Sequence, residues 1–210
     1  FVVKNNIMIK LSLGQGVIMT FLDLIKFFDK QSLVDACDAL HTAEVNPKFL
    51  RCWYKLNKET EIEVRTGAGD SARGLAGPVT GQGGGGAAMA SALNLDLAVD
   101  QYFRDSIDED CYGTVRLQPL IYIDDLARSS TELHSVRAGN MKFSCMAMTK
   151  QLQFHPNKSC FLVHGTENYK AKIKLEAEQE PVKLGINILL EKSQEKYLGD
   201  VFCSQGLSAS

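Results

Sequence analysis

The sequence predicts an α+β fold, in which helices and antiparallel strands are intermixed. A nearly continuous apolar run at residues 16–25 is typical of a strand buried on both faces. Two further strands are expected at 117–123 and 126–128, on either side of two adjacent aspartates. Longer helices are expected at 87–103 and 131–151, and they do not alternate strictly with the strands.

Helix-start signals place the other helices. Ser32 opens a helix whose apolar residues follow at helical spacing: Leu33, Val34, Cys37 and Leu40. Asn46 as cap and Pro47 at the first helical position open another helix, through about Leu56. In the helix at 131–151, the buried face is expected to carry five residues: Leu133, Val136, Met141, Cys145 and Met148.

The remaining strands follow from alternation and turn residues. Residues 61–65 alternate in polarity and precede a turn-rich stretch at 66–70, which predicts a hairpin. A glycine cluster follows at 74–86. Strands are also expected at 159–164 and 197–203.

Composition is typical of a globular protein that buries a real core. Of the 210 residues, 45% are hydrophobic and 23% charged, and no apolar run approaches the ~20 residues of a membrane span. The start at Phe1 has neither an initiator Met nor a signal-peptide layout, which predicts a piece of a longer protein. We therefore expect flanking domains or ribonucleoprotein partners and no membrane partner. The singly spread cysteines, read as reduced, predict an intracellular protein, in the nucleus or cytoplasm and not secreted.

The six cysteines are spread singly, without a C-x-x-C pair, which argues against a zinc site. We expect them to be reduced and partly buried. The formal net charge is −2, but residues 96–132 hold nine acidic residues against three arginines. Residues 142–196 hold nine lysines against six glutamates. An acidic centre suits metal ions and a basic flank suits a phosphate backbone, although a solvated surface explains the lysines equally well.

Three carboxylates are the candidate site. Asp23 lies within a buried apolar run, where an ionised carboxylate is unfavourable without a partner. Asp124 and Asp125 are adjacent like charges directly after an apolar strand. A hairpin that brings Asp124 beside Asp23 would form an oxygen cage for Mg²⁺, and two such ions stabilise an in-line phosphoryl displacement. An ordinary turn and a strand-end cap remain the simpler alternative for these residues.

Five segments in order resemble the motifs of reverse transcriptases of the non-LTR retrotransposon type. Residues 21–29 (FLDLIKFFD) resemble the first palm motif, and 122–125 (YIDD) match Y-x-D-D. Between them, 81–83 (GQG) resemble the Q-G motif. Residues 152–159 (LQFHPNKS) resemble L-x-x-N-P-x-K-T, and 196–199 (KYLG) match the Y-L-G element.

The resemblance implies a right-hand polymerase palm, an antiparallel sheet packed on helices, with partial fingers and little or no thumb. Residues 1–16 would end the fingers region, 17–195 would form the palm with inserted finger elements, and 196–210 would form the primer-grip hairpin and the start of the thumb connection. The implied enzyme is an RNA-directed DNA polymerase, a nucleotidyltransferase of a retrotransposon. Its partners would be an RNA template, a DNA primer and deoxynucleoside triphosphates.

The resemblance also implies catalytic roles. Asp23 and Asp124 would hold two Mg²⁺ ions, which Mn²⁺ can replace, with help from the Leu24 carbonyl and with Asp125 as the accompanying acid. Lys158 would protonate the pyrophosphate leaving group as a general acid.

Nucleotide and primer contacts follow from the same resemblance. Phe28, beside Phe27, would exclude a ribose 2′-hydroxyl, and Gln82 and Gly83 would support the template–nucleotide pair. The primer grip would comprise Tyr197, Leu198 and Gly199. The chain departs from the family at residues 84–88, where Gly-Gly-Gly-Ala-Ala replaces the usual D-P-L-S-P.

Two alternatives stay open. An RNA-directed RNA polymerase uses a similar palm but generally carries G-D-D where this chain has Ile123 before its aspartates. A catalytically inactive protein derived from a reverse transcriptase, with a structural or RNA-binding role, would tolerate the altered glycine loop.

Overall fold

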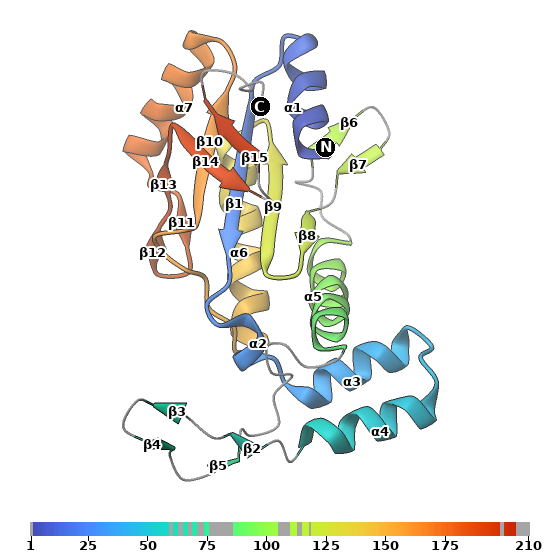
Figure 1. The fold of residues 1–210 in the computed structure, drawn as a ribbon. Coiled ribbons are helices and arrows are strands. Elements are labelled where there is room, and N and C mark those ends of the chain that lie inside the picture. Colours follow the sequence, from blue (N-terminus) through green and yellow to red (C-terminus); the bar gives the residue numbers. More distant parts are fainter. Residues whose placement is uncertain are drawn as a thin grey trace. The chain divides into compact units, whose positions relative to one another are not determined.

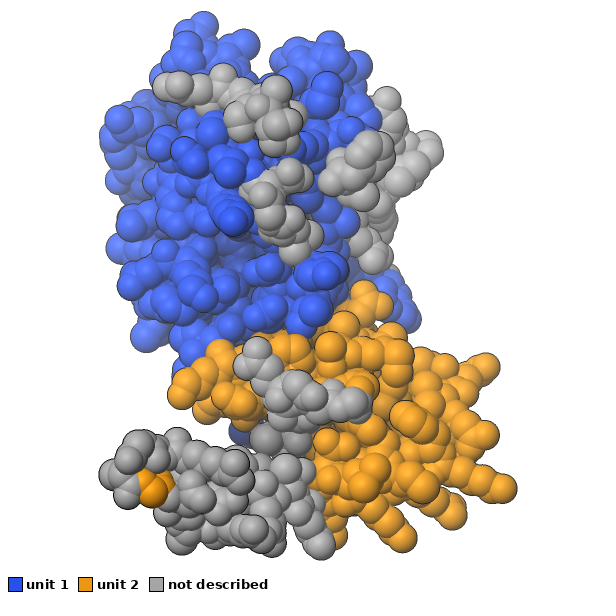
Figure 2. Space-filling model, in the orientation of Figure 1, with its two compact units in different colours: residues 1–25, 99–210 blue, residues 26–98 orange. Residues whose placement is uncertain are grey.

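The structure is a computed structural model. It describes residues 2–58, 61–62, 65–66, 69–70, 74–75, 86–104, 110–112, 115–117, 119–197 and 200–204. The chain divides into two compact units, coloured separately in Figure 2: unit 1 comprises residues 1–25 and 99–210, and unit 2 comprises residues 26–98.

Unit 1 is built on a five-stranded sheet in the order β13-β10-β1-β9-β8 (Figure 1). The strands are β1 (Val17–Asp23), β8 (Leu120–Tyr122), β9 (Asp125–Ser130), β10 (Cys160–His164) and β13 (Leu190–Glu191). Neighbours pair antiparallel except β10 and β13, which are parallel. The predicted α+β class is therefore confirmed, and the sheet is mixed rather than wholly antiparallel.

The central strand β1 is buried on both faces, as its apolar run predicts. Alternate residues point to opposite faces, so Val17, Met19 and Phe21 share one face. They belong to a core cluster with residues of α1 (Val2–Ser12) and of the C-terminal hairpin. The Phe21 ring lies 5.1 Å from Tyr197 and 5.4 Å from Phe202, measured between ring centroids.

The C-terminal hairpin consists of β14 (Gln194–Tyr197) and β15 (Asp200–Cys203). The single strand predicted at 197–203 is wrong, because Tyr197 ends one strand and pairs with Asp200 of the next. A glycine within an apparent strand is a common turn signal, and Gly199 is that glycine. Two more hairpins pair β6 (Asp110–Tyr112) with β7 (Val115–Leu117) and β11 (Lys183–Leu184) with β12 (Asn187–Ile188).

The helix α6 (Leu133–Thr149) confirms the predicted helix but not its whole buried face. Leu133 and Val136 are buried, whereas Met141, Cys145 and Met148 are exposed. Five other residues complete the buried face: Gly139, Asn140, Phe143, Met146 and Ala147. The spacing from Leu133 through Phe143 keeps the 3.6-residue period, which the exposed methionines do not follow.

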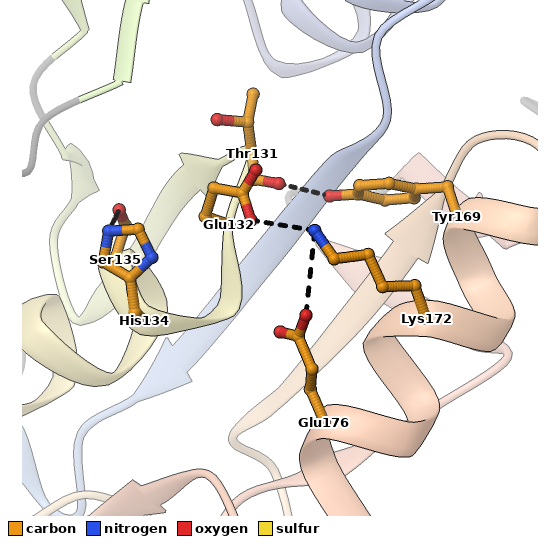
Figure 3. Close-up of polar contacts among 7 residues, drawn as sticks. All are labelled: Thr131, Glu132, His134, Ser135, Tyr169, Lys172 and Glu176. Carbon is orange, nitrogen blue, oxygen red and sulfur yellow. Dashed lines mark hydrogen bonds and ion pairs between the residues drawn. The ribbon is translucent and has the colours of Figure 1, made fainter.

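The helix α7 (Glu167–Gln179) packs beside the sheet and is fixed by polar contacts at its first turns (Figure 3). The Tyr169 hydroxyl donates a 2.7 Å hydrogen bond to the Thr131 carbonyl. The Lys172 ammonium lies 3.4 Å from Glu132 and 3.7 Å from Glu176. The contacts to Thr131 and Glu132 tie α7 to the segment between β9 and α6, whereas the Glu176 pair lies within α7.

Unit 2 contains α2 (Phe27–Lys30), α3 (Leu33–Thr42), α4 (Pro47–Lys58) and the first part of α5 (Ala87–Phe103). Both predicted caps are present. The Ser32 hydroxyl accepts from the Asp35 amide at 3.3 Å, and the Asn46 side chain accepts from the Lys48 amide at 2.9 Å. The core of this unit joins α3, α4 and α5 through five buried residues: Leu33, Ala36, Leu40, Trp53 and Ala90.

Four short strands of unit 2 form two antiparallel pairs. β3 (Arg65–Thr66) pairs with β4 (Gly69–Asp70), which confirms the predicted hairpin. β2 (Glu61–Ile62) pairs with β5 (Gly74–Leu75).

Five cysteines in the described part of the chain are free. Cys160 is buried, Cys37 and Cys203 are half-buried, and Cys52 and Cys145 are exposed. The expectation of partial burial is therefore wrong for the last two, which lie on the solvent faces of α4 and α6. The side chain of Cys111 lies outside the described residues. Among the helices that the structure describes, none combines the length and apolar character needed to cross a membrane.

Candidate active site

The register of the central strands sets Asp23 directly opposite Asp125. Cross-strand partners in an antiparallel pair project to the same face, with Cβ atoms about 5 Å apart. In the next pair, Tyr122 lies opposite Asp125, so Ile123 and Asp124 form the two-residue turn between β8 and β9. The carboxylate paired with Asp23 is thus Asp125, while Asp124 occupies the adjoining turn.

The backbone at this turn is strained. Ile123 has a φ of 59°, which a β-branched residue rarely adopts. Only the first central residue of the turn has a positive φ, as in a type II′ hairpin turn, where glycine is preferred. Such a conformation costs about 1–3 kcal/mol, and Asp124, the second residue of the turn, is half-buried.

The electrostatics of Asp125 reflect its neighbours. Burial raises the pKa of Asp125, and the charges of Asp124 and Asp23 raise it further, whereas Lys158 lowers it. The three aspartates therefore lie close enough for their charges to interact. Without a cation, their mutual repulsion disfavours full ionisation.

Residues 152–159 run beside the end of β1 and bring Lys158 to the aspartates. The Ile25 amide donates to the Gln153 carbonyl at 2.8 Å, and the His155 amide donates to the Asp23 carbonyl at 2.8 Å. Leu24 forms an isolated bridge with Phe154. The Lys158 ammonium lies 3.4 Å from an Asp23 carboxylate oxygen, and most of the lysine side chain is exposed.

The aspartates line a small pocket of about 130 Å³. Its lining joins β1, β9, the lysine-bearing segment and β14 through eight residues: Phe21, Leu22, Asp23, Asp125, Lys158, Glu195, Lys196 and Tyr197. Tyr197 is only 6% exposed, and its hydroxyl has no hydrogen-bond partner within the described chain. Burial and the charge of Asp125 raise the pKa of this phenol, so it is a neutral donor.

Glu195 is a pocket residue that the sequence reasoning missed. Its carboxylate accepts from the Lys192 ammonium and from the Cys160 thiol, the latter at 3.3 Å. Burial alone would raise the pKa of Glu195, but the bonds from Lys192 and Cys160 outweigh it and lower the pKa. Burial and Glu195 together raise the pKa of Cys160 to about 12, so the thiol stays protonated. The sequence could have indicated Glu195 through its two-residue spacing from Tyr197, because side chains two residues apart lie on the same face of a strand.

A larger hollow of about 400 Å³ lies between α6, residues 152–156 and the β11–β12 hairpin. No residue lining it is acidic or basic: Ile25, Ser144, Ala147, Met148, Leu152, Gln153, Phe154, Pro156, Leu184, Gly185, Ile186 and Asn187. The smaller acidic pocket is therefore the better candidate for chemistry.

Phe27 and Phe28 are not among the residues that line the acidic pocket. Phe27 is 2% exposed and is a core aromatic of unit 2, while Phe28 keeps part of its ring exposed. Their ring centroids lie 5.5 Å apart. Gln82, Gly83, Leu198 and Gly199 lie outside the described residues.

The donor set fits a hard divalent cation. Carboxylate and carbonyl oxygens are the ligands that Mg²⁺ prefers, and Asp23, Asp125 and the Leu24 carbonyl supply them at one strand end. In their present positions, no three acidic, histidine or cysteine side chains of the described residues converge tightly enough to enclose one ion. A site in which Asp124 also contributed would need its side chain turned toward the Asp23–Asp125 pair.

No model of a known protein family and no curated protein matches this chain.

Proposed function

We propose that this chain is the palm of an RNA-directed DNA polymerase, a reverse transcriptase of the retrotransposon type. The observation that carries the proposal is the direct pairing of Asp23 with Asp125, with Asp124 in the adjoining turn. These residues are a hundred positions apart in the sequence. Two adjacent acids and a third opposite them are unfavourable in a fold unless they hold cations.

Two further residues that line the same pocket also support the proposal. Lys158 and Tyr197 come from two further motifs of the family order, and both line the pocket with Asp23 and Asp125. Neither residue is near the aspartates in sequence. The order of motifs and the convergence of their side chains are independent observations that favour the same chemistry.

The chain's own residues can then be given roles. Bound Mg²⁺ or Mn²⁺ ions would lower the pKa of a primer 3′-hydroxyl and neutralise charge on the nucleotide phosphates. Asp23, Asp125 and Asp124 would hold these ions. Lys158 is exposed along most of its side chain, so its ammonium can reach a pyrophosphate oxygen and donate a proton to it. Phe28 would select deoxynucleotides by excluding a 2′-hydroxyl.

Primer extension on an RNA template with Mg²⁺ tests the proposal. The purified chain should add deoxynucleotides, and Asp124→Ala should lower the rate by at least about 10²-fold because electrostatic stabilisation of the transition state is lost. Equal extension by the two proteins would contradict the mechanism.

Two other outcomes would point to different functions. Preferential addition of ribonucleotides would favour an RNA-directed RNA polymerase. A folded chain that binds neither Mg²⁺ nor Mn²⁺ would favour an inactive palm with a structural or RNA-binding role.

A further inference from the structure

Helix α4 of unit 2 presents three different faces. Its apolar face is buried: Trp53 is 5% exposed, and Leu50 and Tyr54 pack against the same core. A second face is apolar but exposed, at Phe49, Cys52 and Leu56. The third face is basic, and neither the core nor the proposed polymerase pocket accounts for it.

The basic face is a stripe of four residues, which we call the α4 stripe: Lys48, Arg51, Lys55 and Lys58. They are spaced by three, four and three residues, so at 100° per residue they fall within one narrow sector of the helix. All four are exposed, and α4 contains no acidic residue. None of the four forms an ion pair within the part of the chain that the structure describes.

The lysines of residues 142–196, which suggested a basic flank in the sequence, behave differently. Lys158 pairs with Asp23, Lys170 with Glu167, and Lys192 with Glu195. Lys172 bridges Glu132 and Glu176, as Figure 3 shows. Four of these nine lysines are therefore paired with carboxylates within the fold, whereas no residue of the α4 stripe is paired with a carboxylate of the described chain.

We propose that the α4 stripe binds the sugar–phosphate backbone of a single-stranded nucleic acid. From Lys48 to Lys58 the helix rises about 15 Å at ~1.5 Å per residue. A stacked strand carries one phosphate per roughly 3.4 Å, so about four phosphates lie along that length, one for each basic side chain. Phe49, on the exposed apolar face that flanks the stripe, is 49% exposed and offers a ring on which a base can stack.

A membrane surface is the competing partner, since basic amphipathic helices also bind anionic lipids. Such binding needs a broad apolar face to enter the lipid. The broad apolar face of α4 is already buried against α3 and α5, which leaves Phe49 and Leu56 as its exposed large apolar residues. A partner that recognises charge therefore fits α4 better than one that requires buried apolar area.

The inference adds a second nucleic-acid contact to the proposed polymerase, yet it rests on the charge of α4 and not on metal chemistry. The test is accordingly made without metal. A fluorescent 20-nucleotide uridine RNA is titrated with the full chain in EDTA at several salt concentrations. Arg51→Glu/Lys55→Glu is compared with Lys174→Glu/Lys183→Glu, a control that changes the net charge equally at exposed positions of α7 and β11.

The α4 double variant should bind the RNA at least about tenfold more weakly. Its slope of log affinity against log salt should be shallower by about 1.4, for two lost phosphate contacts at ~0.7 each. The control should stay within about twofold of the wild type, and circular dichroism should show both variants folded. Equal losses in the two variants, or no loss in the α4 variant, would overturn the inference.

Further arms identify the ligand. Single-stranded DNA of matched length should show the same dependence on α4, because the phosphate chemistry is shared. Phe49→Ser should weaken RNA binding by roughly fivefold or more without changing the salt slope. If the α4 variant loses binding to phosphatidylserine vesicles but keeps RNA binding, the membrane is the partner and the proposal fails. A milder pair, Lys48→Gln/Lys58→Gln, gives the same comparison should the charge reversals unfold α4.

Discussion

The position of Asp125 suits the proposed metal binding but destabilises the folded chain. It lies directly opposite Asp23, and its pKa is raised by burial and by the charges of Asp124 and Asp23. Like charges opposite one another in a sheet destabilise it by about 0.2–1 kcal/mol. Because the pKa is raised in the folded state, the penalty is present at neutral pH and relieved as Asp125 is protonated.

Asp125→Asn should therefore raise the free energy of unfolding in EDTA by about 0.2–1 kcal/mol. Urea denaturation at neutral pH measures it. Asp96→Asn, at an exposed position of α5, should change stability by less than about 0.5 kcal/mol. Primer extension should be lost in the first variant and retained in the second. A less stable Asp125→Asn protein would mean that the carboxylate stabilises the fold.

At this scale the sequence predicted that the three carboxylates meet, but not how they pair. It indicated that Asp23 meets the Asp124-Asp125 pair, but the partner depends on the turn. The two-residue turn with its positive φ at Ile123 sets Asp125, not Asp124, opposite Asp23. A β-branched residue gives no sequence signal for that conformation. Glu195 was missed because Cys160, 35 residues away in the sequence, becomes its neighbour only in the fold.

Among the elements, α6 illustrates the limit of hydrophobicity as a guide. The buried face includes Gly139 and Asn140, which a search for apolar residues passes over. A Cβ at Gly139 would overlap the buried Arg128 guanidinium, and the Asn140 amide donates to the Lys183 carbonyl at 3.1 Å. Gly139 is buried because the Arg128 side chain packs against it, and Asn140 because it forms a hydrogen bond. The periodicity of apolar residues predicts neither.

Helix α7 was not predicted, for a related reason. Ile173 is its one buried residue, so the helix has no apolar stripe to detect. The local signal was a cap, since the Thr166 hydroxyl accepts from the Tyr169 amide at 3.3 Å. The helix is instead held by its contacts to the sheet and to the segment before α6 (Figure 3).

The Tyr169 ring leaves no room for a side chain at Gly16, at the start of β1, because a Cβ there would overlap the ring. Gly16→Ala should lower the free energy of unfolding by about 1–3 kcal/mol through overpacking. Chemical denaturation measures the loss. In a Tyr169→Leu background the same substitution should cost less than about 0.5 kcal/mol. Equal losses in the two backgrounds would exclude the ring as the cause.

At the scale of the whole molecule, the sequence pattern predicted four of the five strands of the central sheet, β1, β8, β9 and β10, but not their order. The central position of β1 between β9 and β10 depends on pairings across a hundred residues or more, for which a local pattern carries no information. The family resemblance gave Asp23, Asp125, Lys158 and Tyr197 separate roles in one polymerase site, and the structure places all four around one pocket. What that pocket does stays a prediction.

Global stability should depend on pH through His164, which ends β10 and is 1% exposed. Burial, with a smaller contribution from Lys170, lowers the pKa of His164 to about 4. The unfolded chain takes up a proton near pH 6.5, so it binds more protons than the folded chain between these values. The free energy of unfolding is therefore highest above the pKa of His164 in the unfolded chain, and it decreases as the pH falls below that value.

Lowering the pH from about 7.5 to about 5 should reduce the free energy of unfolding by about 2 kcal/mol, because of His164. Urea titrations at both pH values measure the change. In His164→Gln, whose side chain cannot be protonated, the loss of unfolding free energy between these pH values should be smaller by about 2 kcal/mol. An unchanged slope in the variant would show that other groups govern the acid sensitivity.

The central claim is that Asp23 and the Asp124-Asp125 turn hold divalent cations. Electron paramagnetic resonance of Mn²⁺ titrated into the 210-residue chain is the direct test. We expect bound Mn²⁺ that excess Mg²⁺ displaces, an affinity at least about tenfold weaker in Asp23→Asn, and an unchanged affinity in Asp96→Asn. A folded wild-type chain that binds no Mn²⁺, or an Asp23→Asn chain that binds it equally well, would contradict the account.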